Sequence, residues 1–315
     1  MKVRQVNLRM LRGFVACLLL AVSLTASAQA ASVQESVAPL LTTAWGQDAP
    51  YNMLCPEKEN GKGEMQHCKV GCVACAMGQV MNYYQYPEIG IGTGTNLFNQ
   101  SLTVNFGETY YDWQHMRNSY VGSYTDEEAT AVATLLYHCG VAVNMIYGLQ
   151  SSSTFTAFAN NMTTALTKYF GYDSDVRSVN RSNYSKDEWL QMIREELSAG
   201  RPIIYTGTSP SMGGHTWVVD GYDQEGRVHM NWGWLGLSNN YYDIDLLTAG
   251  YDFKEKQSMV IGIQPSTAAS IRGATSVNNA SSPLNDDLYS LDGRIVKQPV
   301  RAGIYIKNGK KVIIK

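Results

Sequence analysis

One segment, Val70–Tyr84, constrains the fold of this chain more than any other. After Gly71, apolar residues recur at steps of three and four, which predicts a helix with one buried stripe. The members of the stripe are Val73, Ala76, Met77, Val80, Met81 and Tyr84. Pro87 ends the helix, because proline lacks an amide donor and disfavours helical geometry in the residue before it. The chain is therefore expected to fold around a core helix whose first turn carries Cys72.

Cys72 lies where a helix favours negative charge. The first N–H groups of a helix have no partner within it, and the macrodipole places positive charge there. Both effects lower the pKa of a thiol, and the thiolate is the nucleophilic form. A cysteine on an apolar helix is more often a small core residue, but Gly71 favours an accessible helix start. The position predicts a catalytic cysteine.

The spacing of Cys68, Cys72 and Cys75 allows a rival interpretation. The pattern C-x3-C-x2-C holds an iron–sulfur cluster in radical enzymes, which belong in a reducing compartment and in a much larger barrel. The histidines are scattered and show no metal-ligand spacing. We therefore expect neither a metal nor another cofactor.

The N-terminus argues for export from the cytoplasm. Basic residues precede the apolar run Gly13–Leu24, and Ala28-Gln29-Ala30 follows it. This pattern predicts a secretory signal peptide over residues 1–30, and hence a secreted or cell-surface protein. No later stretch approaches the roughly 18 apolar residues of a membrane span. The net charge of −2 gives no reason to expect a nucleic acid as partner.

The exported chain keeps five cysteines, and an odd number predicts one free thiol. Cys72 is the natural candidate. The pairing of the other four, if they pair at all, cannot be deduced from the sequence: Cys55, Cys68, Cys75 and Cys139.

The order of predicted elements indicates an α+β architecture. Helices are expected at Thr125–Cys139, at Thr154–Phe170 and after the capping box that Ser185 opens. From Pro202 the apolar period changes to two, which predicts antiparallel strands. The predicted strands are Ile203–Gly207, Thr216–Gly221, Val228–Trp232 and Gln257–Gln264. Residues 57–66 are interpreted as a surface loop.

The last part of the chain is expected to form a small β module. Residues 266–285 have the composition of a linker. Two hairpins are predicted after it, turning at Asp292-Gly293 and Asn308-Gly309. The predicted parts are a signal peptide (1–30), a catalytic domain (31–265), a linker (266–285) and a β tail (286–315).

His215 is the best candidate base among the five histidines. Gly213 and Gly214 precede it and leave room for a substrate backbone, and a strand fixes the direction of its ring. If the hairpin loop after this strand has two or four residues, Trp232 and Trp234 lie on the same face of the sheet as His215. A loop that is one residue longer or shorter places Asn231 on that face instead. A carboxamide can accept the ring N–H, and an indole can shield that bond; the indoles can also be plain aromatic core.

Gln47 is the candidate donor for an oxyanion. A glutamine upstream of the nucleophile can place its N–H beside the backbone N–H of Cys72. One such donor contributes roughly 3 kcal/mol in the transition state.

At these residues the chain resembles the streptopain family of papain-like cysteine peptidases. The matching segments, in chain order, are Trp45-Gly46-Gln47, Pro50-Tyr51-Asn52, Gly71–Ala74, Tyr83–Pro87, Tyr147-Gly148, Phe170-Gly171-Tyr172, Asn180-Arg181-Ser182, Ser185-Lys186, Gly213-Gly214-His215, Asp220-Gly221 and Asn231-Trp232-Gly233-Trp234.

The resemblance implies a two-lobed fold, with helices in one lobe and an antiparallel sheet in the other. It implies Cys72 as nucleophile, His215 as base and Gln47 as oxyanion donor, with Asn231 and Trp232 beside the imidazole. Cys72 and His215 would meet across a groove as a sulfur–imidazolium ion pair. The resemblance further implies a substrate cleft lined by Gly214 and Ser153, to which we add Trp234.

The expected activity is cleavage of peptide bonds in proteins through an acyl-enzyme. The family often prefers a hydrophobic residue two positions before the scissile bond. An amidase or acyl transferase acting on cell-wall amides, and a non-catalytic exported binding module, are the alternatives.

Three features need a separate interpretation. Family members usually carry a sizeable inhibitory pro-region, and fewer than ten residues lie between the signal peptide and this domain, so a separate inhibitor protein is one expectation. Cys68 and Cys75 flank the nucleophile and can quench it by disulfide exchange. Finally, residues 288–315 resemble C-terminal sorting domains of type IX secretion in Bacteroidetes.

Overall fold

The computed structural model describes residues 33–154, 160–245 and 252–266, together with four strands of the tail. The predicted signal peptide and nearly all of the predicted linker lie outside the described residues. None of the helices described is long and apolar enough to cross a membrane.

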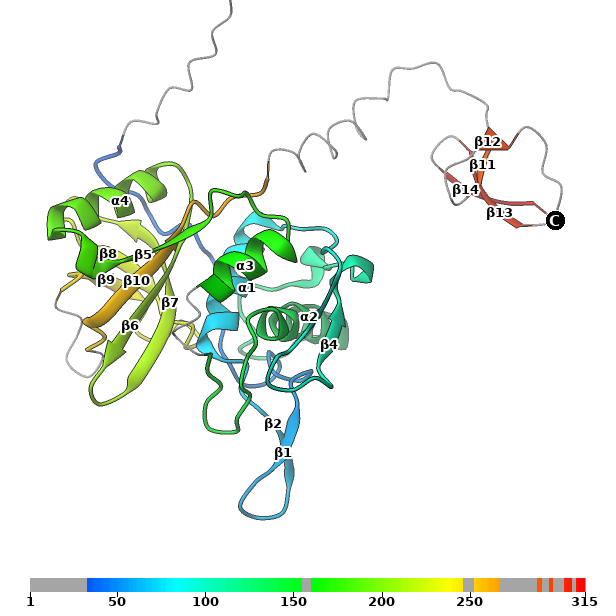
Figure 1. The fold of residues 1–315 in the computed structure, drawn as a ribbon, viewed down its shortest axis with the longest axis horizontal. Helices are drawn as coiled ribbons and strands as arrows, with labels where there is room; N and C mark the ends of the chain where they lie inside the picture. Colours follow the sequence, from blue (N-terminus) through cyan, green and yellow to red (C-terminus); the bar gives the residue numbers. More distant parts are fainter. Residues whose placement is uncertain are drawn as a thin grey trace, which may run out of the picture. The chain divides into compact units, whose positions relative to one another are not determined.

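The first lobe is built around α1 (Cys72–Tyr84), which packs against α2 (Asp126–Ala142) (Figure 1). Gly78 permits this close approach, because a Cβ there would lie 2.3 Å from Leu136 of α2. A third helix, α3, spans Asn160–Lys168, within the predicted range. Short antiparallel pairs complete the lobe: β1 (Glu57–Glu59) with β2 (Met65–His67), and β3 (Thr93–Thr95) with β4 (Thr103–Asn105).

The prediction of one buried stripe on α1 was too narrow. All nine residues from Val73 to Met81 are buried, since α2 covers one side of the helix and the sheet of the second lobe covers another. The helix ends at Tyr84, where Gln85 takes a left-handed conformation with φ of 47°. It therefore stops before Pro87, as the sequence predicts.

The second lobe is a six-stranded antiparallel sheet in the order β5-β10-β6-β7-β8-β9. Its strands are β5 (Arg177–Asn180), β6 (Ile203–Ser209), β7 (Gly213–Tyr222), β8 (Val228–Asn231), β9 (Asn240–Tyr242) and β10 (Glu255–Ile261). Side chains on the two faces of a strand alternate. Val218 of β7 accordingly joins the core around α1, whereas Trp217 joins a second core under α4 (Lys186–Ser198).

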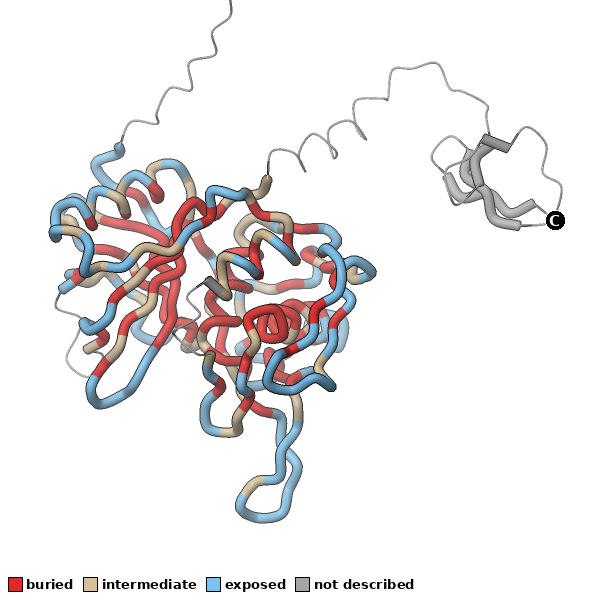
Figure 2. Tube along the Cα trace, in the orientation of Figure 1, coloured by how far each residue is buried: buried red, intermediate tan, exposed pale blue. Residues whose placement is uncertain are grey.

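The observed elements confirm the α+β fold, although β5, a strand of the sheet that was not predicted, precedes α4 in the chain. The capping boxes at the starts of α2 and α4 are both formed. The interpretation of residues 57–66 as a loop was wrong, because they form the exposed hairpin β1–β2, which projects from the first lobe (Figure 2). Its strands bury no side chain, so the sequence shows no alternation of apolar and polar residues there.

The tail forms a separate four-stranded sheet in the order β12-β11-β13-β14. Its strands are β11 (Leu288–Ser290), β12 (Ile295–Val296), β13 (Gly303–Lys307) and β14 (Lys310–Ile314). Lys307 pairs with Lys310. The turns predicted at Asp292-Gly293 and Asn308-Gly309 lie outside the described residues.

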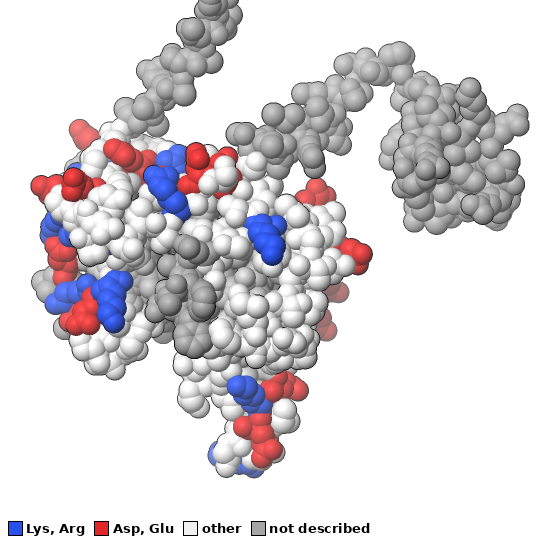
Figure 3. Space-filling model, viewed as in Figure 1, with Lys and Arg blue, Asp and Glu red and all other residues white. Residues whose placement is uncertain are grey.

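Both signs of charge are mixed over the sheet lobe and over the β1–β2 hairpin (Figure 3). No large patch of one sign covers this face. A mixed surface gives no reason to expect attraction to a polyanion.

Candidate active site

Cys72 is the first residue of α1, and the backbone around it is set by Gly71. Gly71 has φ of 91°, and a Cβ there would lie 2.7 Å from Met145, so no other residue fits without strain. No side chain caps the helix start. Cys72 is half-buried, whereas the other described free cysteines, at positions 55, 68, 75 and 139, are buried. Among them it is the one that a substrate can reach.

The environment of the thiol corrects one expectation. Burial raises the pKa of the Cys72 thiol above its usual value, and hydrogen bonds from Thr216 and from the amides of Val73 and Cys72 lower it by less. The amides at the helix start lower the pKa, as predicted, but desolvation raises it by more. The thiol is therefore protonated at neutral pH in this arrangement.

Strand β7 brings the histidine segment against the thiol. Both the backbone and the hydroxyl of Thr216 hydrogen-bond toward the sulfur of Cys72. Thr216 directly follows His215, and its side chain lies on the α1 face of the strand. Thr216 was not predicted as a site residue from the sequence, although its place beside the candidate base could have marked it.

The ring of His215 lies in an aromatic cluster with residues of the second core. Its centroid is 4.7 Å from Trp234, 5.3 Å from Phe253 and 6.0 Å from Trp217. The side chain is 7% exposed, and burial lowers the pKa of His215 to about 4. The imidazole is therefore neutral at pH 7.

A backbone carbonyl fixes the tautomer of His215. Nε2 lies 2.9 Å from the carbonyl oxygen of Trp232. A carbonyl can only accept, so we place the proton on Nε2. The second nitrogen, Nδ1, then carries a lone pair and makes no hydrogen bond to a described residue. It is the atom available to take a proton.

Cys72 and His215 share one region of the molecule without a direct bond. Within the described residues no hydrogen bond joins the thiol to the imidazole, and both groups are neutral. The sulfur–imidazolium ion pair therefore stays a prediction.

A β-bulge decides which residues face the histidine. Tyr222 pairs with Val228, so the hairpin loop has five residues, which by itself would put Asn231 on the histidine face. Asp220 has no partner in the ladder, however, and Val218 pairs with Asn231. This restores the register in which the indoles lie on the side of His215. The bulge forms where the N-terminal segment crosses, because the amide of Leu41 donates to the Asp220 carboxylate at 3.0 Å.

Of the two candidates to orient the ring, Trp232 contacts it through its main chain. The carboxamide of Asn231 lies in a buried network instead: it accepts from Gln79 and from the amide of Gly233, and it donates to the Thr43 carbonyl. The shielding expected of an indole comes mainly from Trp234, which stacks on the imidazole.

The other predicted residues lie around the thiol and its strand. The backbone carbonyl of Gln47 accepts from Val70, and its half-buried carboxamide makes no hydrogen bond within the described part of the chain. Gly214 is exposed and has open space where a Cβ would stand. Ser153 is exposed, and its neighbour Ser152 bonds the carbonyl of Lys69 at 2.6 Å, close to the start of α1.

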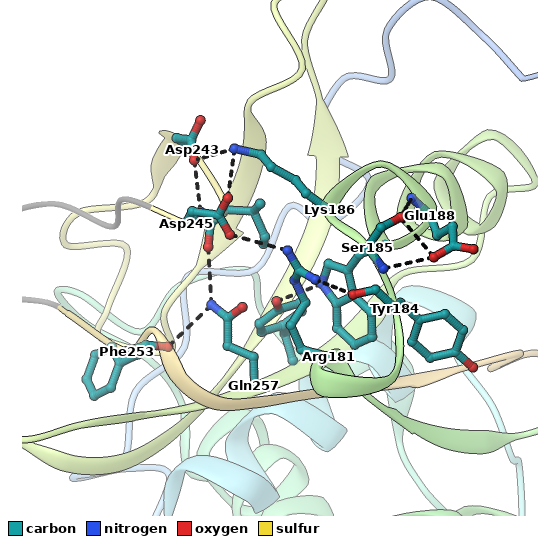
Figure 4. A network of polar contacts seen from close by, with 12 residues as sticks. Arg181, Tyr184, Ser185, Lys186, Glu188, Asp243, Asp245, Phe253 and Gln257 are labelled. Carbon is teal, nitrogen blue, oxygen red and sulfur yellow. Dashed lines mark hydrogen bonds and ion pairs between the residues drawn. The ribbon is translucent and has the colours of Figure 1, made fainter.

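Phe253, which was also not predicted from the sequence, is held by a polar network (Figure 4). Gln257 donates to the carbonyls of Ile244 and Phe253 at 3.2 and 3.4 Å. Lys186 reaches Asp245 at 2.8 Å, and Arg181 pairs with the same carboxylate. No sequence motif marks Phe253, since it precedes β10 and contacts residues distant in the chain.

No group of three His, Cys, Asp or Glu side chains within the described ranges is arranged to hold a metal ion. The cysteines at positions 68, 72 and 75 form no such group.

Comparison with known proteins places this geometry in context. The profile of the Peptidase C10 family matches residues 45–242. The thiol protease/hemagglutinin PrtT of Porphyromonas gingivalis is 33% identical over 300 residues, which cover 87% of this chain and 32% of PrtT. Streptopain of Streptococcus pyogenes is 34% identical over 244 residues, which cover 70% of this chain and 60% of streptopain. The chain thus spans less than two thirds of the length of these relatives.

Solved structures show the same fold. The active wild-type interpain A cysteine protease of Prevotella intermedia is 41% identical, with a TM-score of 0.66, and the match covers 72% of this chain and 95% of that one. A fragment of prointerpain A from the same organism is 40% identical, with a TM-score of 0.65 and 74% of each chain covered.

Proposed function

Because this chain belongs to the Peptidase C10 family, we propose that it is a cysteine endopeptidase in which Cys72 is the nucleophile and His215 the base. One observation carries the assignment. Cys72 is the accessible member of the described free cysteines, at an uncapped helix start, and the strand that carries His215 lies against its sulfur.

The reaction begins with two neutral groups. Nδ1 of His215 takes the proton of the Cys72 thiol as the sulfur attacks the peptide carbonyl, which forms the C–S bond. The amide of Cys72 and the carboxamide of Gln47 donate to the developing oxyanion. The imidazolium then protonates the departing amine, and the C–N bond breaks. His215 next removes a proton from water, which attacks the acyl group. The C–S bond breaks, and the imidazolium returns its proton to the sulfur of Cys72 as the acid product leaves.

We assign substrate contacts to Gly214, Ser153 and Trp234. Gly214 and Ser153 are exposed, and a residue without a side chain at position 214 lets an extended backbone approach β7 closely. Trp234 is half-buried and offers an apolar surface beside the imidazole. The substrates are proteins or peptides.

Export and regulation are further parts of the proposal. The composition of residues 1–30 supports secretion through a signal peptide, and the β tail supports a role in type IX sorting. A separate inhibitor protein is the proposed partner that would restrain this activity.

Cleavage of denatured casein, together with labelling by the epoxide E-64, tests the assignment. The wild-type protein should cleave casein and take one label, and Cys72→Ala should abolish both. An amidase would leave casein intact and release peptides from cell wall. A binding module would take no label under reducing conditions.

A further inference from the structure

Gln79 is a fully buried polar side chain in the middle of an apolar helix. It lies two turns after Cys72 on α1, with 0% of its surface exposed. A buried carboxamide costs free energy unless its groups are hydrogen-bonded. Its Oε1 accepts from the Thr43 hydroxyl at 2.9 Å and from the Trp45 amide at 3.3 Å. Its Nε2 donates to Oδ1 of Asn231 at 3.3 Å.

Two backbone groups determine how both carboxamides are turned. The amide of Trp45 can only donate, so it faces Oε1 of Gln79, and Nε2 must point to the other side. The carbonyl of Thr43 can only accept, so it faces Nδ2 of Asn231, at 2.7 Å. Oδ1 of Asn231 is thereby directed at Gln79 and at the amide of Gly233, 3.2 Å away.

The Gly233 amide belongs to the same peptide unit as the Trp232 carbonyl. A trans peptide is planar, and its N–H and C=O point in opposite directions. Holding the N–H on Asn231 therefore directs the carbonyl toward Nε2 of His215, which it meets at 2.9 Å. Gly233 has φ of 70°, and a Cβ there would lie 3.1 Å from the Cys75 sulfur, so the turn is also packed against α1.

We propose that Gln79 is a positioning residue of the active site: through Asn231 it sets the direction of the Trp232 carbonyl that orients His215. The same side chain bonds to residues 43 and 45, which precede Gln47. One carboxamide thus links the helix of the nucleophile, the segment of the oxyanion donor and the loop that holds the base. The inference rests on the proposed function, because it concerns the geometry of that reaction.

The first test replaces the carboxamide with an apolar side chain of similar length. Gln79→Met should lower kcat per active site about tenfold, with KM nearly unchanged. This loss is a fraction of the ~10²–10⁴-fold rate enhancement that positioned proton transfer contributes. The number of active sites is measured by E-64 titration, so a loss of folded protein does not change the value of kcat per site. The ionisation of His215 in the pH profile of kcat/KM should move to lower pH, since the imidazolium loses part of its acceptor.

A second variant keeps the shape of the side chain. Gln79→Glu retains the acceptor for residues 43 and 45, but it can donate to Asn231 only while the new carboxyl is protonated. Its kcat relative to wild type should therefore rise as the pH falls. The matched control is Asn96→Leu, which removes another fully buried carboxamide, bonded to the backbone of Met145 and Phe98 and not to residues 43, 45 or 231. It should reduce the titratable fraction and leave kcat per site unchanged.

Each result decides between the two claims. A wild-type protein that does not react with E-64 would contradict the proposed function. An active wild type with unchanged kcat per site and pH profile in Gln79→Met would overturn the positioning role. If Gln79→Met yields no titratable protein, a pH-independent kcat ratio for Gln79→Glu overturns it instead.

Discussion

At the scale of the residue, the protonation of Cys72 depends on a competition between burial and hydrogen bonding. Desolvation disfavours the thiolate, whereas the amides of the first helical turn and Thr216 favour it. Desolvation also keeps His215 neutral, with a pKa of about 4. The two candidate catalytic groups are thus thiol and imidazole before substrate binds.

This protonation state predicts the pH dependence of alkylation. The rate constant for reaction of Cys72 with iodoacetamide should be low at pH 6 and should rise through the alkaline range, because only the thiolate reacts. Mass spectrometry of the labelled peptide identifies the site. A rate that is already high and constant from pH 5 to 8 would show that the ion pair exists in the free protein.

Gln47 is predicted to act only when charge develops on the substrate. Its carboxamide bonds to no described residue, so it is available to an oxyanion. Gln47→Leu should lower kcat by about 10²-fold with little change in KM, because one oxyanion donor contributes roughly 3 kcal/mol. Asp48→Asn, on the next residue, removes an exposed ion pair with Lys69 and should leave kcat unchanged. Equal losses in the two variants would contradict the role of Gln47.

At the scale of the element, α1 carries two cysteines one turn apart. Cα atoms three residues apart on a helix are about 5 Å apart, which lies within the range that a disulfide bridges. Cys75 is 1% exposed, and its thiol lies near enough to Cys72 to interact electrostatically. The flanking cysteine noted in the sequence is therefore placed to react with the nucleophile.

This placement predicts reversible inactivation by oxidation. Diamide should take up the two protons and two electrons of the thiols, form a Cys72–Cys75 disulfide and abolish activity until dithiothreitol is added. Cys75→Ser should keep its activity under the same treatment. Peptide mapping identifies the disulfide, and a Cys75→Ser protein that is inactivated as fast as wild type would exclude it.

At the scale of the whole molecule, two buried histidines make stability depend on pH. Burial lowers the pKa of both His138 and His215 to about 4, from a usual value of 6.5. Below pH 6.5 the unfolded chain binds protons that the folded chain does not, so the free energy of unfolding falls as the pH decreases toward 4. At pH 5 the loss is about 2 kcal/mol for each group.

Urea unfolding at pH 7.5 and pH 5 measures this loss. His138→Phe removes one of the two groups at a site away from Cys72, where the ring bonds to Tyr111. The variant is expected to be less stable at both values, because the buried Tyr111 hydroxyl loses its partner. The difference between the two pH values should nevertheless be smaller than in wild type. An unchanged difference would show that His138 is not buried in its neutral form.

Local signals in the sequence determined much of this protein. The spacing of apolar residues in α1, the capping box of α4 and the period of two after Pro202 each depend on neighbouring residues, so they can be recognised along the chain. They predicted the α+β fold and the placement of Cys72 at a helix start. The hairpin β1–β2 was not predicted, because it buries no side chain.

The tertiary structure decided how the site is assembled. A bulge at Asp220 decides which residues of β8 lie on the face of His215, and this bulge forms against the distant segment around Leu41. Asn231 accepts a hydrogen bond from Gln79, on another element, and the ionisation of Cys72 follows from the desolvation of its thiol. Each of these contacts joins residues far apart in the chain, and burial is a property of the packed molecule. Periodicity and capping, which act over a few residues, carry no information about them.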